Sequence, residues 1–111
     1  MGVKISKKDY TLIVKIDGEL DHHQAESVKK TIDEEYEKKD CKNIIFDLKN
    51  LTFMDSSGIG VIIGRYKKVK NNGGKVAIAN TGQHLKKLIE VSGLLRIIKC
   101  YNSLEEAIKD M

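Results

Sequence analysis

Two adjacent serines, Ser56 and Ser57, follow an aspartate in the stretch FMDSSGIG at residues 53–60. A serine hydroxyl can cap a helix, attack as a nucleophile or carry a phosphate, and its neighbours decide between these roles. The apolar residues before Asp55 are typical of a strand, whereas apolar residues at helical spacing begin at Ile59. The serines are therefore expected at the start of a helix, in a loop that faces solvent.

This position leaves two roles open. One serine is expected to cap the helix by accepting a backbone N–H, but a cap accounts for only one of the two hydroxyls. A helix N-terminus also carries free N–H groups and partial positive charge, so it tolerates an added phosphate. A kinase can reach a hydroxyl in such a loop. Capping and phosphorylation are both compatible with the sequence at this point.

A nucleophilic serine has little support. The nucleophile elbow of hydrolases reads G-x-S-x-G, and Met54 stands where its first glycine belongs. His22 and His23 are placed at a predicted helix N-terminus, which disfavours positive charge, and His84 is the third histidine. Adjacent helical residues point in different directions, so the histidine pair does not predict a metal site. We expect no metal and no cofactor, and a small serine hydrolase is kept as an alternative hypothesis.

Three glycines follow the serines, but they do not form a phosphate-binding loop. Gly58, Gly60 and Gly64 read G-x-G-x-x-x-G, which differs from the dinucleotide fingerprint and lacks the lysine of a P-loop. Gly60 and Gly64 are four residues apart and share one stripe of the helix. Each costs about 1 kcal/mol relative to alanine in a helix interior. We therefore expect one of the two to pack internally and the other to meet a partner.

The composition is typical of one soluble globular domain. The chain has 111 residues, of which 41% are hydrophobic and 32% are charged. No apolar stretch approaches the roughly 20 residues that span a bilayer, and the N-terminus lacks the apolar segment of a signal peptide. We expect a cytoplasmic protein without a membrane partner, in which Cys41 and Cys100 are reduced thiols.

The charge is mildly basic, with a formal net charge of +4 from 20 basic and 16 acidic residues. The lysines are spread among acids, whereas nucleic-acid binding needs a focused basic surface, so no direct nucleic-acid partner is expected. The run RYKKVKNNGGK at residues 65–75 is basic. Its lysines suit the negative end of a helix dipole, and the alternative is attraction to an acidic partner surface.

Segments of strand type alternate along the chain with segments of helix type. The predicted strands are 3–5, 10–18, 43–48, 75–80 and 96–101. The predicted helices are 21–39, 59–70, 81–93 and 103–111. Asp21 with Gln24 and Ser103 with Glu106 predict capping boxes, and Gly73 and Gly93 predict helix ends. The expected core faces are Leu12, Val14 and Ile16 in the first long strand, and Ala25, Val28, Ile32 and Tyr36 in the first helix.

Three stretches resemble the STAS domain of bacterial anti-sigma factor antagonists. They are GELDHH at 18–23, LTFMDSSGIGVIIGRYK at 51–67 and VSGLLRII at 91–98. The resemblance covers essentially the whole chain, so residues 1–111 are expected to form one STAS domain. It implies an α/β fold with a single mixed β-sheet of four to five strands and about four α-helices. GELDHH is most similar to the sporulation group, the antagonists of the anti-sigma-F factor.

The resemblance implies a binding switch and no enzyme. In that family the unphosphorylated antagonist binds an anti-sigma factor and frees the sigma factor, here for sporulation transcription. The anti-sigma factor is also a serine kinase that uses ATP, and its target maps to Ser56. A metal-dependent phosphatase restores the active form. The alternative is a STAS antagonist of another partner-switching circuit, such as the general stress response.

The resemblance also implies which residues meet the partner. They lie in the GELDHH loop and in the serine region: Gly18, Glu19, Asp21, Asp55, Ser56, Ser57, Gly58 and Gly60. Asp55 is expected either to anchor the amides of its loop or to contact the kinase. Because a helix N-terminus accommodates the anion, phosphorylation is expected to act at the interface and to leave the fold nearly unchanged.

Overall fold

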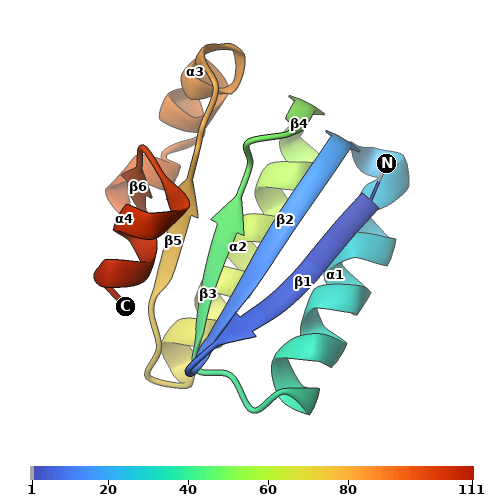
Figure 1. Cartoon of the computed structure of the whole chain (residues 1–111). Helices are drawn as coiled ribbons and strands as arrows, with labels where there is room; N and C mark the ends of the chain where they lie inside the picture. The colour runs from blue at the N-terminus through green and yellow to red at the C-terminus, as the bar shows by residue number, and fades with distance from the viewer. Residues whose placement is uncertain (1) are drawn as a thin grey trace.

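The structure, a computed structural model, describes residues 2–111. Strands and helices alternate along these residues (Figure 1), which confirms the predicted α/β class. In chain order the elements are β1 (Gly2–Lys8), β2 (Thr11–Leu20), α1 (His22–Lys38), β3 (Asn43–Asp47), β4 (Leu51–Met54), α2 (Ser56–Asn71), β5 (Val76–Ala79), α3 (Gln83–Ser92), a 3-10 turn (Leu94–Arg96), β6 (Lys99–Tyr101) and α4 (Leu104–Lys109).

The strands of residues 2–111 form one mixed sheet of six strands, five of them in the order β1-β2-β3-β5-β6. β1 and β2 make an antiparallel hairpin, whereas β2, β3, β5 and β6 are parallel neighbours. The sixth strand, β4, pairs in parallel with the last residues of β2. The sheet thus has the predicted mixed character, with one strand more than the four to five expected.

The additional strand is β4, whose apolar residues before Asp55 are typical of a strand but which is not among the five strands predicted from the sequence. Only three residues lie between β3 and β4, and they turn the chain back towards β2. The Leu51 N–H donates to the Leu48 carbonyl (3.1 Å), and the Gly18 N–H donates to the Asn50 carbonyl (3.0 Å). This turn brings the segment before the serines to the end of β2.

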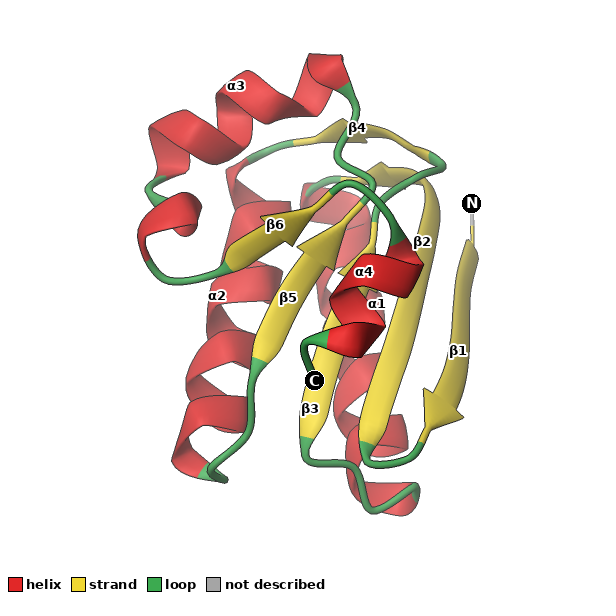
Figure 2. Ribbon diagram, turned by 60° about the vertical axis from the view of Figure 1, so that its left-hand side comes forward, coloured by secondary structure: helices red, strands yellow, loops and turns green. Residues whose placement is uncertain are grey.

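Helices cover both faces of the sheet (Figures 1 and 2). The larger apolar core lies between one face of the sheet and α1, α2 and α3. A smaller cluster on the opposite face joins Ala107 of α4 to Ile45, Ala77 and Ala79. The two alanines of β5 leave room for α4 close to the sheet. The site-bearing helices α1 and α2 therefore share one layer.

The predicted core faces of β2 and α1 are confirmed. Both sets of residues are buried, with Ala25 only partly so: Leu12, Val14, Ile16, Val28, Ile32 and Tyr36. Fully burying a large aliphatic side chain contributes about 1.5–3 kcal/mol. These contacts anchor α1 on β2, and the GELDHH loop connects the two elements.

A pair of charges holds α1 against α2. Nε of the buried Arg65 lies 2.9 Å from Oδ1 of Asp33, although the geometry is not that of a hydrogen bond. Lys68 lies 3.7 Å from the same oxygen and 3.1 Å from Glu37. A charge taken out of water needs a partner, so Arg65 constrains how α2 lies along α1.

Helix ends follow the predicted glycines, whereas the last strand is shorter than predicted. Gly73 (φ 78°) and Gly93 (φ 85°) adopt the left-handed conformation after α2 and α3. The predicted strand 96–101 is wrong at its start, because the Arg96 N–H donates to the Gly93 carbonyl (3.1 Å) in a 3-10 turn. Cys41 and Cys100 are unbridged, and burial raises the pKa of both thiols.

Gly58 sits where α2 approaches the end of β2 most closely. A Cβ built on Gly58 would lie 2.5 Å from the Leu20 carbonyl oxygen and 2.5 Å from Cγ of Met54. Real side chains do not tolerate that distance, and a backbone oxygen cannot move away as a flexible side chain can. By contrast, a Cβ on Gly60 would meet nothing within 4 Å.

These two glycines provide a matched test of the packing. Gly58→Ala should lower the free energy of unfolding by about 1–3 kcal/mol, because the added methyl overpacks the helix against β2. Gly60→Ala should raise it by up to about 1 kcal/mol, because alanine favours the helix and space is open. Urea denaturation of both variants measures the difference. Equal effects of the two substitutions would contradict the close approach at Gly58.

Candidate functional site

The GELDHH loop and the serine region, which are distant in sequence, meet at one end of the sheet. β4 pairs with the end of β2 so that Glu19 is opposite Phe53 and Leu20 is opposite Met54. The chain then enters α1 from β2 and α2 from β4. Both helices consequently start side by side at the upper end of the molecule in Figure 1.

The carboxylate of Asp55 joins the two helix starts. Its Oδ1 accepts the N–H groups of Ser57 (2.9 Å) and Gly58 (3.3 Å), which caps α2. Its Oδ2 accepts the N–H of His22, the first residue of α1, at 3.1 Å. Of the two roles expected for Asp55, these bonds confirm the anchoring of nearby amides and extend it to the other helix, while the contact with a kinase stays a prediction.

This geometry corrects the predicted serine cap. Asp55 has the extended backbone of an N-cap residue, and α2 begins at Ser56. Both serines therefore lie inside the first turn, where their hydroxyls are not needed for capping. Ser56 is exposed and Ser57 is half-buried. The physical reason is the carboxylate, which supplies one oxygen to α2 and a second to α1.

Asp21 caps α1, as the sequence predicted. Its Oδ1 accepts the N–H groups of His23 (3.0 Å) and Gln24 (3.1 Å). Both bonds use one oxygen, so the second oxygen is left for other contacts. Glu19, two residues earlier, is exposed. Two carboxylates therefore lie close together in sequence at the α1 start.

The predicted partner glycines have different structural roles. Gly18 has φ 83° at the irregularity where β2 pairs with β4, a conformation that a side chain would strain. Gly58 is buried against Leu20 and Met54, so its predicted contact with a partner needs correction: it positions the serine turn. Gly60 is exposed on α2.

A shallow groove runs between α1 and α2 beside the serines. Its volume is about 410 Å³, and its lining includes His22, Ala25, Ser57, Gly60 and Gly64. A Cβ on either Gly60 or Gly64 would meet nothing within 4 Å. The expectation that one of these glycines packs internally is therefore wrong, because both face the open groove.

Sequence reasoning missed Phe53, which is the large apolar residue closest to the serines in the chain that remains exposed. Its side chain is 49% exposed on β4, whereas Leu51 and Met54 of the same strand are buried. The burial of β4 does not follow strict alternation, so no period in the sequence reveals Phe53. An exposed aromatic ring beside polar groups is typical of a protein interface.

The described residues place neither a histidine base nor a metal-binding cluster at the serines. Between residues 2 and 111, no hydrogen bond joins a histidine to either serine hydroxyl, and Nε2 of His84 instead lies 3.1 Å from the Leu51 carbonyl oxygen. No group of three or more His, Cys, Asp or Glu within that range is placed to hold a metal ion. None of its helices is long and apolar enough to cross a membrane.

Comparison with known proteins gives consistent similarities. The family model described as "STAS domain" matches residues 3–107. An anti-sigma F factor antagonist from Paenibacillus polymyxa is 41% identical over 100 residues, which cover 90% of this chain and 86% of the relative. An anti-sigma-B factor antagonist from Bacillus subtilis (strain 168) is 31% identical over 98 residues, 88% of each chain.

The fold is also similar to solved structures. The structure of the Bacillus cell fate determinant SpoIIAA in the phosphorylated form matches with a TM-score of 0.77 and 28% identity. The match covers 98% of this chain and 98% of SpoIIAA. The predicted STAS fold is confirmed by this likeness together with the family match.

The double role of Asp55 can be measured. Asp55→Ala removes the cap of α2 and the bond to His22, so the free energy of unfolding should fall by about 2 kcal/mol, the sum of one cap and one further hydrogen bond. Asp55→Asn keeps one acceptor oxygen, so its free energy of unfolding should lie between those of the wild type and the alanine variant. Urea denaturation provides the values, and the NMR shift of the His22 amide reports the bond between the helices.

Asp21→Ala is the control, because Asp21 caps only its own helix. Its free energy of unfolding should fall by about 1 kcal/mol. If Asp55→Ala were as stable as Asp21→Ala and left the NMR shift of the His22 amide unchanged, the hydrogen bond between Asp55 and His22 would be contradicted.

Proposed function

The chain belongs to the STAS domain family, and on this premise we propose that it is a phosphorylation-controlled antagonist of an anti-sigma factor. The observation that carries the proposal is the position of Ser56. Its hydroxyl is exposed at the first residue of α2, where Asp55 joins the starts of two helices. A kinase can reach this hydroxyl without unfolding any element.

The fold can hold a phosphate on Ser56. In the proposed reaction the Ser56 oxygen attacks the γ-phosphorus of ATP held by the kinase, the serine loses its proton and ADP leaves. The product carries about −1.5 to −2 charges at neutral pH. It sits at the positive ends of the α1 and α2 dipoles, which favour an anion. The core faces do not include Ser56, so the fold should persist.

The same phosphate would disrupt an interface centred on Ser56. Glu19, Asp21 and Asp55 are placed around the serine turn, so the surface suits a partner with cationic side chains. Because partner cations would attract the added dianion, we expect the loss of binding to come from its bulk, from the cost of desolvating it, and from its repulsion of acidic groups or bound nucleotide in the partner. A difference of about 3 kcal/mol in binding free energy would change the affinity more than a hundredfold, which is enough for a switch.

The partner surface is proposed to extend from the GELDHH loop across the serines to the groove between α1 and α2. Gly18, Glu19, Asp21 and the exposed Ser56 form its polar part. Phe53 supplies an exposed aromatic anchor, and Gly60 lets the partner approach the helix backbone closely. The open space above Gly60 is consistent with such a contact, because the glycine has no packing role inside the chain.

The proposed circuit is sporulation, in which the partner is an anti-sigma factor that is also a serine kinase, and a phosphatase reverses the modification. The higher identity to an anti-sigma F factor antagonist supports this choice. The second candidate is a general stress circuit, because an anti-sigma-B factor antagonist is 31% identical. Incubation of the protein with ATP and a purified kinase from each circuit distinguishes the two candidates. If the circuit is sporulation, the anti-sigma-F kinase should transfer phosphate to the protein and the other kinase should not.

Ser56 should be the phosphorylated serine. After incubation with the anti-sigma kinase and ATP, mass spectrometry of peptides should place one phosphate on Ser56. Ser56→Ala should abolish the modification and bind the partner persistently. Ser57→Ala is the matched control, because Ser57 is the half-buried neighbour, and it should still be modified. Phosphate found on Ser57 alone would refute the assignment.

Asp21→Asn separates capping from recognition. Asparagine keeps the oxygen that accepts from His23 and Gln24 and caps as well as aspartate, so the free energy of unfolding should hardly change. The affinity for the anti-sigma factor should fall if the free oxygen meets a partner cation, where breaking a desolvated charge pair costs roughly 2–5 kcal/mol. A denaturation curve and a calorimetric titration measure the two effects. An unchanged affinity would leave Asp21 as a cap only.

A further inference from the structure

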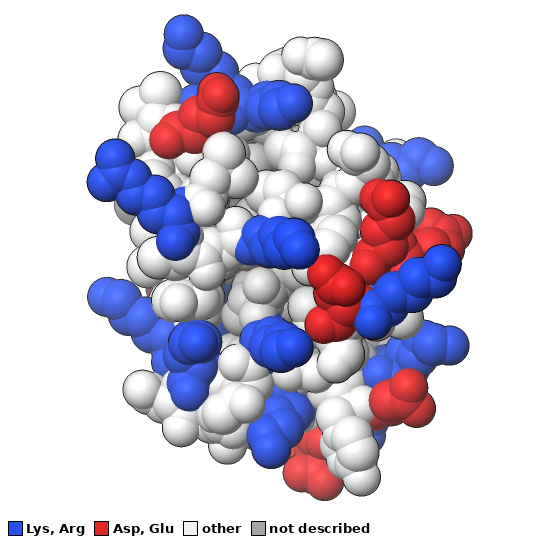
Figure 3. Space-filling model, turned by 90° about the vertical axis from the view of Figure 1, so that its left-hand side faces the viewer, with Lys and Arg blue, Asp and Glu red and all other residues white. Residues whose placement is uncertain are grey.

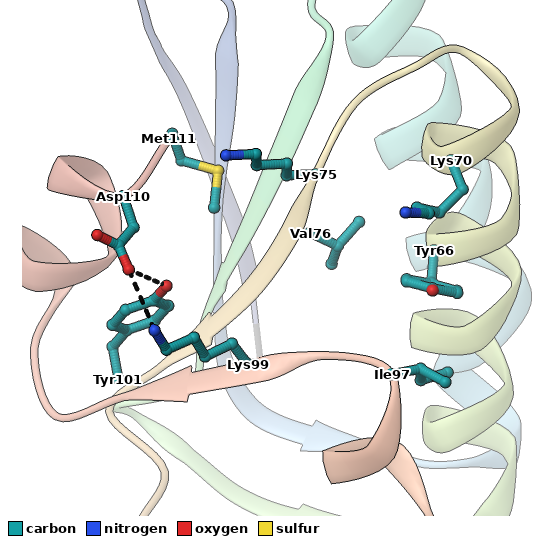
Figure 4. Close-up of a pocket in the computed structure, with 9 residues that line it drawn as sticks. All are labelled: Tyr66, Lys70, Lys75, Val76, Ile97, Lys99, Tyr101, Asp110 and Met111. Atoms are coloured by element: carbon teal, nitrogen blue, oxygen red, sulfur yellow. Dashed lines mark hydrogen bonds and ion pairs between the residues drawn. The ribbon is translucent and has the colours of Figure 1, made fainter.

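The basic run of residues 65–75 contributes to a pocket far from the serines. The pocket lies between the last turns of α2, the start of β5, β6 and the end of α4, and its volume is about 430 Å³ (Figure 4). Lys70 and Lys75 of the run meet Lys99 of β6 around this pocket. The fold therefore places around one pocket three lysines that are up to 29 residues apart in the sequence.

The pocket has an excess of positive charge. Its lining side chains include three lysines and one aspartate, Asp110, a side-chain charge of 3 − 1 = +2. Lys99 lies 3.4 Å from Asp110, whereas within residues 2–111 no ion pair involves Lys70 or Lys75. Figure 3 shows basic side chains through the middle and along the left-hand side of this face of the molecule, with uncharged surface between them.

Among residues 2–111, the ion pair of Asp110 is with Lys99 and not with Lys70 or Lys75. Its Oδ2 accepts a hydrogen bond from the Tyr101 hydroxyl (2.6 Å) as well as one from Lys99 (3.4 Å). These hydrogen bonds lower the pKa of Asp110, while burial and the bond to Asp110 raise the pKa of Tyr101 to about 12. Both donors bind Oδ2, so Oδ1 of the charged aspartate is left for other contacts, and the charge of Lys75 also contributes to the lowered pKa of Asp110.

The remaining wall of the pocket is apolar or aromatic. Tyr66 and Ile97 lie on one side and Met111 on the other, with Val76 between them (Figure 4). Ile97 is 44% exposed, so its side chain is available to an apolar group in the pocket. A ligand for this pocket thus needs anionic groups for the lysines and an apolar body for this wall.

We propose that this pocket binds a small organic anion that carries at least two negative charges and an apolar body. Pockets of this size suit small molecules, with a few polar groups fixing the orientation. The site is separate from the proposed partner surface. α2 has 16 residues and is about 24 Å long, with Ser56 at its start and Lys70 in its last turn.

The test is an NMR titration of the full-length, ¹⁵N-labelled protein with 1-naphthyl phosphate at pH 7 and low salt. The ligand should cause saturable shifts of the amides around the pocket, those of Lys70, Val76, Ile97 and Lys99, and none at Ser56. Lys70→Gln and Lys75→Gln should each weaken binding by about two- to fivefold, the range for an exposed charge contact. Lys87→Gln, an exposed lysine on α3, is the matched control and should leave the affinity unchanged.

Three results would overturn the proposal. The first is amide shifts that do not saturate with ligand, or an affinity that changes equally in Lys75→Gln and Lys87→Gln. The second is binding of inorganic pyrophosphate as tight as that of naphthyl phosphate, because the apolar wall would then play no part. The third is tighter binding of a glutamate-rich peptide at the same amides, which would identify an acidic protein segment instead. A Ser56→Ala variant should bind naphthyl phosphate normally, so the result is independent of the proposed phosphorylation switch.

Discussion

The Asp55 carboxylate accepts N–H groups from the first turns of both α1 and α2, and the geometry of the serine site depends on this shared acceptor. A helix leaves its first N–H groups without internal partners, and here one side chain satisfies three of them in two helices. The two helix starts are thereby held side by side. Because capping is done by the aspartate, the hydroxyl of Ser56 remains available for chemistry.

The shared cap requires that β4 lie directly beside the end of β2. Gly58 makes this approach possible, because any side chain there would collide with the Leu20 carbonyl. Gly18 contributes the left-handed turn of the backbone where β2 changes its pairing to β4. Both glycines determine the path of the backbone at the site and do not provide contacts of their own. This explains why the resemblance includes Gly58 in the site although it is buried.

α2 connects two chemically different ends of the molecule. Its N-terminal turn presents Ser56 among acidic groups, and its C-terminal turn presents Lys70 in a basic pocket. The orientation of the helix dipole suits this distribution at the C-terminal end, where cations are favoured. At the N-terminal end it favours an added anion, such as the phosphate proposed on Ser56. The ion pair between Arg65 and Asp33 fixes the middle of the helix against α1.

Local patterns in the sequence determined most of the element types and the core faces of β2 and α1. They also determined the caps at Asp21 and Ser103 and the helix ends at Gly73 and Gly93. Each of these depends on residues within a few positions of one another, where a period of two or 3.6 and a capping side chain are sufficient. The motif residues also indicated the STAS family and the place of the serines.

Only the tertiary structure decided what depends on partners distant in the chain. Asp55 outcompetes the serines as the cap because its second oxygen reaches His22, which is 33 residues away. β4 is a separate strand because it pairs with β2, and Phe53 is exposed because nothing packs over that edge. The three lysines of the basic pocket meet because β6 lies beside β5. Such contacts are set by how the sheet is ordered, and no local period in the sequence encodes that order.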